Sequence, residues 1–446
     1  MRSLFTASTA LACILGCLIV ATASAEDSPA TPDEDARAGD STRRGGLSSD
    51  PEDPQNLLPD IQERRAEKDS LLPVSPLYWL HEGTDWWKKS LSELGGIEFG
   101  ADVTHLFQGL SEALPGEEQW GTATTSNFFG TWELIARGKP YRGQIVAHGQ
   151  ARWDYGQPGP EELGPASLGS AIGTANTFSE YEPSRFVLRN FYWQQGSEEA
   201  GWAYRIGKIT PDAILSSSQH LNASTTFMPN TSIGSFSSAH ADSGLGLTAA
   251  WFPTDRIRLL GLISDANGDR QNWGDLGAGD FYESIELGVK LAPRTPKAGY
   301  SKLTFWHTDG TKNGEPANAS LGPSGWGFFL KLEQELTADG RLIGIVRYGR
   351  SYDDSAAYKQ LASAHLLLYD PHFIGHIRND LVGIAFNWAE VPVSAARSEY
   401  NVEAFYRFPI FPSVDMTLSY QSVINPALDR DNHHASVFSL RLRTTF

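Results

Sequence analysis

Charged side chains of both signs occur at every second position in several short segments, where they alternate with apolar residues. Such alternation puts the charged side chains on one face of a β-strand. Guanidinium groups and carboxylates hydrogen-bond readily to hydroxyl groups, so this face can guide a polyhydroxylated solute. The candidates are Glu98, Asp102, Glu133, Arg152, Arg205, Lys290, Lys331, Arg347, Glu403, Arg407, Arg441 and Arg443.

Sequence motifs for catalysis or cofactor binding are absent. There is no Gly-rich phosphate loop, no H-E-x-x-H and no G-x-S-x-G. The two cysteines, Cys13 and Cys17, are too few for a Cys-cluster zinc site. A net charge of −17 argues against a general nucleic-acid binder. We therefore expect no enzyme activity, no metal site, no cofactor and no nucleic-acid partner.

The first 25 residues have the pattern of a cleaved signal peptide. Arg2 supplies a positive start, residues 11–20 form an apolar stretch, and residues 23–25 read Ala-Ser-Ala, a small-residue cleavage site. The alternative is a lipoprotein signal with Cys17 as the lipidated residue. The apolar residues that continue past Cys17 make that a poor match.

Two further segments follow the expected signal peptide. Residues 26–76 are acidic and Pro-rich with almost no aromatic residues, so they cannot bury enough apolar surface to fold and are expected to form a disordered spacer. Residues 77–446 are expected to be a single folded domain.

Alternation with a period of two dominates the chain from residue 95 onward. No apolar stretch after residue 25 approaches the roughly 20 residues of a membrane-spanning helix. We count sixteen strand-like runs, at 96–107, 127–137, 144–153, 185–194, 202–208, 244–252, 257–264, 283–291, 300–308, 326–335, 341–350, 359–368, 380–389, 398–408, 414–421 and 436–446. Alternation is poor in 185–194 and 359–368.

The connections between these runs alternate between long and short. That pattern is typical of a membrane β-barrel, with short turns at the periplasmic end and longer external loops. The sequence therefore predicts an all-β fold, a transmembrane antiparallel barrel of about 16 strands. Apolar residues would face lipid and polar residues a wet lumen, which explains a mean hydropathy of −0.32. A secreted all-β binding protein is the alternative fold assignment.

The longest internal loop, residues 209–243, is the best candidate to fold inward and narrow the lumen. It is uncharged over most of its length and rich in Ser, Thr and Asn, which suits a neutral polyhydroxylated solute. The constriction candidates are Lys208, Asp212, Asn222 and Asn230. The alternatives are a general or cation-preferring pore, favoured by the negative net charge, and an outer-membrane barrel enzyme, which would need a Ser–His pair on the outer face.

Several motifs, in their order along residues 80–446, resemble the OprB family of carbohydrate-selective porins. They include Asp85-Trp86 with Gly95-Gly96-Ile97, Gly207-Lys208 with Asp212, Asp265-Ala266-Asn267, Arg378 and Asp380 with Gly383, and the terminal region with Glu403, Tyr406-Arg407, Gln421, Asn425-Pro426 and Leu440-Arg441-Leu442. The chain departs from the family pattern at Trp87-Lys88 and in the acidic segment 26–76.

This resemblance implies an outer-membrane porin of sixteen strands that passes small sugars by facilitated diffusion. The expected partners are small carbohydrates and outer-membrane lipid. The expected location is the outer membrane of a bacterium, reached by export with a cleaved signal peptide. The sequence is compatible with a monomer and with a homo-oligomer such as a trimer.

Overall fold

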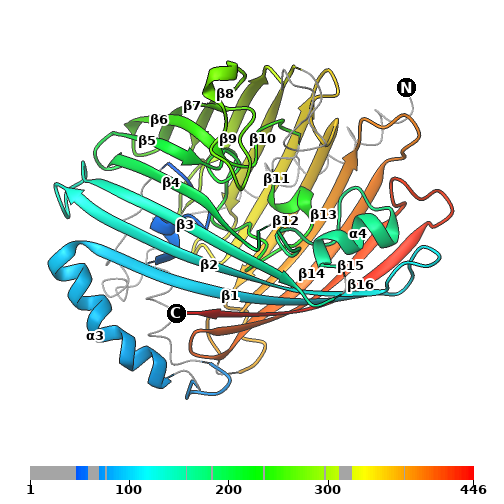
Figure 1. The fold of residues 1–446 in the computed structure, drawn as a ribbon. Helices are drawn as coiled ribbons and strands as arrows, with labels where there is room; N and C mark the ends of the chain where they lie inside the picture. Colours follow the sequence, from blue (N-terminus) through cyan, green and yellow to red (C-terminus); the bar gives the residue numbers. More distant parts are fainter. Residues whose placement is uncertain are drawn as a thin grey trace.

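The computed structural model describes residues 47–58, 70–75, 78–156, 158–181, 184–234, 237–295, 298–310, 324–375 and 377–446. Sixteen antiparallel strands form one closed barrel in which each strand pairs with its neighbours in sequence and β1 pairs with β16 (Figure 1). The all-β barrel predicted from the sequence is thus confirmed. The signal peptide expected at residues 1–25 lies outside the described residues.

The strands are β1 (Ile97–Leu110), β2 (Trp120–Ile135), β3 (Gly143–Asp154), β4 (Phe186–Ser197), β5 (Trp202–Ile209), β6 (Gly244–Thr254), β7 (Ile257–Asp265), β8 (Phe281–Val289), β9 (Ser301–Thr308), β10 (Gly325–Glu335), β11 (Leu342–Ser351), β12 (Gln360–Tyr369), β13 (Leu381–Glu390), β14 (Glu399–Phe411), β15 (Val414–Ile424) and β16 (His434–Thr445). The helices are α3 (Tyr78–Gly95), α4 (Pro160–Leu168) and α5 (Asn230–Ile233), with a short 3-10 helix, η2 (Leu276–Ala278).

Side chains on the strands alternate between an apolar outer face and a polar inner face. In β16, Phe438 and Leu440 are exposed on the outside of the barrel, whereas Ser439, Arg441 and Arg443 are buried inside it. A barrel hydrogen-bonds every strand to two neighbours, so no strand edge meets lipid. Among the described residues, no helix is long and apolar enough to cross a membrane.

Strands β4 and β12 correspond to the two runs in which alternation is poor. In β12, the inward-facing Leu361 and Leu367 are apolar and fully buried. Leu367 packs with Leu221 and Phe227 of the long β5–β6 connection, which lies inside the barrel. Part of the inner wall therefore contacts protein instead of water. Apolar residues can then occupy inward positions, which weakens the alternation of apolar and polar residues along β12.

The long and short connections are sorted by barrel end, as the sequence predicts. Short connections at one end include 136–142, 198–201, 255–256, 336–341 and 412–413; long ones at the other end include 155–185, 210–243 and 266–280. The chain ends at the short-turn end, where the Phe446 backbone N–H donates to the carbonyl of Ala101 at 2.8 Å. Two connections depart from this rule, 370–380 and 391–398.

Helix α3 precedes the first strand and lies against the outside of the barrel (Figure 1). The ring of Trp87 stacks on Phe99 of β1 with a centroid distance of 4.7 Å. Trp86 and Leu94 are 78% and 82% exposed. Apolar side chains on the outside of a membrane barrel suit the interfacial region of the bilayer. The sequence pattern did not predict this helix.

Candidate functional site

The connection between β5 and β6, residues 210–243, folds into the lumen of the barrel. Phe227 is fully buried, and its ring lies 4.9 Å from that of Phe405 on β14 and 5.0 Å from that of His365 on β12. Ile214 and Leu215 pack against the inner faces of β6 and β7. The structure therefore places this loop inward, where the sequence expected it.

Three inward arginines on different strands hold the loop by its backbone. Arg347 on β11 donates to the carbonyls of Thr231 at 2.9 Å and Gly234 at 2.5 Å. Arg407 on β14 donates to Thr225 O at 3.1 Å. Arg441 on β16 donates to Ala223 O at 2.5 Å and Thr226 O at 2.9 Å. Hydrogen bonds from charged donors are worth about 1.5–3 kcal/mol each, so these arginines are strong anchors.

A second set of anchors lies on β8, β9 and β10 and contacts residues 216–218. Lys302 and Lys331 both donate to the carbonyl of Ser217, at 2.7 and 2.8 Å. Glu286 accepts from the backbone N–H of Ser216 at 2.7 Å. Glu333 accepts from the Ser218 hydroxyl at 2.7 Å and pairs with Lys331 at 2.7 Å. Each buried charge thus has a partner, as burial requires.

The wall residues predicted to line the lumen divide into two groups by position. Nine are buried on the inner face: Asp102, Arg152, Arg205, Lys331, Arg347, Glu403, Arg407, Arg441 and Arg443. Glu98, Glu133 and Lys290 lie near the short-turn end and are partly exposed. Glu133 pairs with Arg142 at 3.1 Å, and Lys290 pairs with Glu198 at 2.7 Å.

The buried carboxylates of this set also have defined partners. Glu403 accepts from the backbone N–H of Met228 at 3.0 Å and from the Ser419 hydroxyl at 2.8 Å. Asp102 pairs with Arg443 at 2.8 Å. Arg152, near the long-loop end, pairs with Glu161 of α4 at 3.1 Å. The inner wall therefore carries partnered charges of both signs.

The four constriction candidates occupy different places along the loop. Lys208 is buried at the end of β5 and donates to Arg270 O at 3.0 Å. Asp212 lies 3.6 Å from His240, Oδ1 to Nε2. Asn222 accepts from the backbone N–H of Ser224 at 2.8 Å, and Asn230 accepts from the Asn176 side chain at 2.7 Å.

Charged neighbours set the pKa values of two titratable groups in the loop. Burial opposes ionisation of Asp242, but the guanidinium groups of Arg270 and Arg189 lower its pKa to about 2. Burial lowers the pKa of His240, but its contact with Asp212 outweighs this and raises the pKa overall. The contacts of Asp242 fasten the loop to Arg189 of β4 and to Arg270. The pair of His240 with Asp212 joins the two ends of the loop to each other.

Sequence reasoning missed a second inward segment, residues 47–58, which lies inside the expected spacer 26–76. The rest of that spacer is described only at 70–75, where the backbone N–H groups of Leu71 and Leu72 donate to the carbonyls of Pro409 and Ile410 at the short-turn end. Arg258 on β7, fully buried and 2.5 Å from Glu286, was also missed. The sequence pattern does not mark Arg258 as an inward residue, because its inward neighbours Leu260 and Leu262 are apolar and break the alternation.

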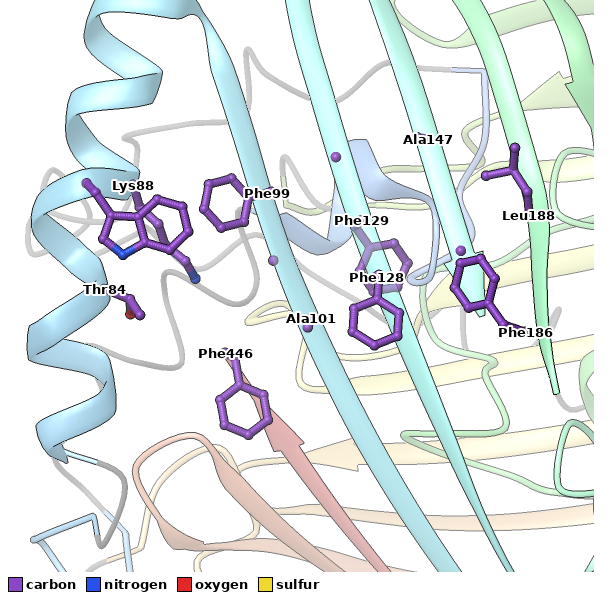
Figure 2. A pocket seen from close by; sticks show the side chains of 14 residues that line it. Thr84, Lys88, Phe99, Ala101, Phe128, Phe129, Ala147, Phe186, Leu188 and Phe446 are labelled. Atoms are coloured by element: carbon purple, nitrogen blue, oxygen red, sulfur yellow. The ribbon is translucent and has the colours of Figure 1, made fainter. Parts of the chain in front are cut away.

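One cavity of the described residues lies outside the lumen. It is a groove of about 580 Å³ between α3 and the outer face of β1–β4, lined by Trp87, Lys88, Phe99, Phe128, Phe186 and Phe446 among others (Figure 2). None of its lining residues belongs to the inward loop 210–243, so we do not assign the groove to the solute path. Within the described part of the chain, no cluster of three or more His, Cys, Asp or Glu side chains is placed to hold a metal ion.

The chain is similar to several solved structures. The chain is similar to Pseudomonas putida OprB in its high-pH structure, with 12% identity, a TM-score of 0.66, and coverage of 85% of this chain and 99% of that one. The low-pH structure gives 12% identity, a TM-score of 0.47 and coverage of 81% and 97%. A triple mutant of the Rhodopseudomonas blastica porin has 10% identity and a TM-score of 0.46, with coverage of 78% of this chain and 100% of that one. The first of these shows a shared fold.

A search of curated proteins finds no match to this sequence. The family model described as carbohydrate-selective porin, OprB family, matches residues 164–446, which is more than half of the chain. The protein therefore belongs to the OprB family of carbohydrate-selective porins.

Proposed function

We propose that the protein is an outer-membrane channel through which small sugars diffuse passively, past a constriction formed where residues 210–243 fold into the lumen. The observation that carries this proposal is the anchoring of that loop by wall charges. Arg347, Arg407 and Arg441 donate hydrogen bonds to carbonyls of the loop. A mostly uncharged, hydroxyl-rich segment is thereby held inside the barrel. Such a surface suits a neutral solute.

We also propose that the protein is exported to the outer membrane by a cleaved signal peptide. A barrel of this kind assembles in the bacterial outer membrane, and the first 25 residues supply the pattern of a signal peptide to reach it. We expect cleavage after Ala25. Amino-terminal sequencing of the purified membrane protein tests this, and a mature chain that begins upstream of residue 20 would contradict it.

Liposome swelling tests the transport activity. Liposomes that contain the purified protein should swell in isotonic glucose and more slowly in a disaccharide of the same osmolarity. Empty liposomes and liposomes with heat-unfolded protein are the controls. Swelling only in ionic solutes would point to a general or cation-preferring porin, and a reversal potential measured across a planar bilayer would then report its ion preference.

A further inference from the structure

Residues 47–58 lie inside the barrel although they precede the first strand by about forty positions. Leu57 and Leu58 are buried against the inward-facing ring of Phe129 on β2. Leu47 is fully buried and packs in the cluster that includes Tyr192 of β4. Apolar side chains at both ends of the segment are thus removed from water, which favours the docked position.

Polar contacts fix the register of this segment on the wall. The side-chain amides of Gln55 and Gln194 on β4 form a reciprocal pair, at 2.6 and 2.8 Å. Asp53 pairs with Arg205 on β5 at 2.7 Å, and both side chains are only 3% exposed. An ion pair this well buried needs both partners, because either charge alone would be left without compensation.

The opposite side of the segment contacts the inward loop. The backbone N–H of Ser49 donates to the Ser217 hydroxyl at 3.0 Å. The Ser224 hydroxyl donates to Glu52 at 2.9 Å, and the Ser48 hydroxyl donates to the carbonyl of Ala213. Residues 47–58 therefore sit between the wall and the loop and join the two.

The charges of the segment are complementary to those of the wall that it covers. A small cavity there is lined by Glu52 and Asp53 of the segment and by Arg189 and Arg205 of the wall. Without the segment, these two arginines would face the lumen with fewer carboxylates beside them. Cationic walls raise the local concentration of anions.

We propose that residues 47–58 are a resident part of the pore, which narrows the lumen and neutralises the arginines of β4 and β5, so that uncharged solutes pass in preference to anions. This inference rests on the proposed transport function. It identifies residues before the first strand as determinants of selectivity.

Deletion of residues 47–58 from the full chain tests the proposal. Single-channel conductance in a planar bilayer should rise several-fold, and under a KCl gradient the reversal potential should move toward that of chloride. Heat-modifiable gel mobility shows whether the barrel has assembled. An assembled deletion variant with unchanged conductance and reversal potential would overturn the proposal.

Point variants keep the test valid if the deletion variant fails to assemble. The single substitution Asp53→Asn removes the carboxylate beside Arg205 and should move the reversal potential toward chloride. Glu199→Gln, on the exposed turn at the short-turn end, is the control for loss of an acidic charge and should leave the reversal potential unchanged. Equal shifts in the two variants would show that the segment has no special role.

Cysteine cross-linking tests the docked position directly. Because the side chains of Gln55 and Gln194 meet at their amide ends, a short bismaleimide cross-linker added to isolated outer membranes should join the two cysteines of the double variant Gln55→Cys with Gln194→Cys. Cys13 and Cys17 lie in the expected signal peptide, so the introduced pair would be the only thiols of the mature chain. The cross-linked protein should show altered mobility on a denaturing gel, and each single-cysteine variant should not. Absence of this cross-link in an assembled barrel whose two cysteines both react with a monofunctional maleimide would overturn the docked position.

The two proposals fail in different ways. If wild-type protein does not swell liposomes in any sugar, the transport function is wrong. If wild-type protein passes sugars and the deletion variant behaves identically, the transport function stands and only the role of residues 47–58 is wrong.

Discussion

Arg347, Arg407 and Arg441 come from three strands, yet each donates to backbone carbonyls of residues 223–234. Guanidinium groups suit this task because their fixed donors reach two acceptors at once. At the residue scale, therefore, several of the alternating charges of the sequence hold the loop, and others pair with charged groups elsewhere in the barrel. Few of them stand free to meet a solute.

Replacing Arg347 tests this holding role. Arg347→Gln removes two charge-assisted hydrogen bonds, to Thr231 and Gly234, which are worth about 1.5–3 kcal/mol each. The loop should loosen, and the initial rate of liposome swelling in glucose should rise. Arg256→Gln, on the exposed β6–β7 turn, is the matched control and should swell at the wild-type rate. A slower rate in Arg347→Gln than in wild type would contradict a holding role.

Asp50 gives docking of residues 47–58 a pH dependence. Burial raises the pKa of Asp50 from 3.8 to about 8, and the carboxylates of Glu52 and Asp53 add to the shift. The docked segment thus keeps a proton on Asp50 that the released segment loses near pH 4, so the contribution of Asp50 to docking is fully present below pH 4 and is lost as pH rises to about 8. Conductance should therefore increase over this range.

The control for this pH effect is Asp50→Asn, which cannot ionise at that position. Its conductance should depend less on pH between 4 and 8 than that of wild type, because the carboxyl group of Asp50 is gone and all other titratable groups of the lumen are the same in both proteins. Planar-bilayer recordings at fixed ionic strength measure both. Identical pH profiles in the two proteins would exclude Asp50 as the group responsible.

At the scale of elements, the loop and the wall are fitted to each other by small residues as well as by charge. Gly349 on β11 lies where a β-carbon would coincide with the side chain of Ser237 in the loop. Glycine at this position lets the loop approach the backbone of the strand. The β5–β6 connection is thus packed into the barrel as closely as a core element.

A larger side chain at position 349 should displace the loop. Gly349→Val is expected to increase proteolytic cleavage within residues 210–243 in outer-membrane vesicles and to raise the swelling rate in glucose. Gly261→Val is the matched control, because a β-carbon at Gly261 would meet open space. Equal protease resistance in the two variants would show that the contact at Gly349 does not hold the loop.

Alternation predicted the strands well because most of them separate an apolar outside from a polar inside. It weakened at β12, where Leu361 and Leu367 face protein in the lumen. Residues 47–58 escaped prediction for a related reason. Their docking relies on Asp53, Gln55 and a few leucines, a composition that also fits a solvated spacer, and only the facing wall distinguishes the two.

At the scale of the whole molecule, the barrel must match two solvents at once. Its outer face carries Ile285, Phe305, Leu418 and Phe438, each at least 49% exposed, while the inner face is polar and filled by two inward segments. Phe305 and Phe438 lie beside other outward rings, those of Phe328 and Tyr420, so apolar side chains are grouped on this face. Lipid is the environment that makes such exposure favourable.

The depth of a charge on this outer face should therefore decide its cost. Leu440 lies near the middle of β16 and pairs with Leu418, whereas His434 lies at the end of the same strand. Leu440→Arg should lower the free energy of unfolding in lipid vesicles by about 2–4 kcal/mol, and His434→Arg by about 0–1 kcal/mol. Denaturant titration with reversible refolding measures both. Because the two substitutions introduce the same charge on one strand, equal costs would mean that the middle of β16 does not face the hydrocarbon of the bilayer, and the barrel would not span the membrane at this strand.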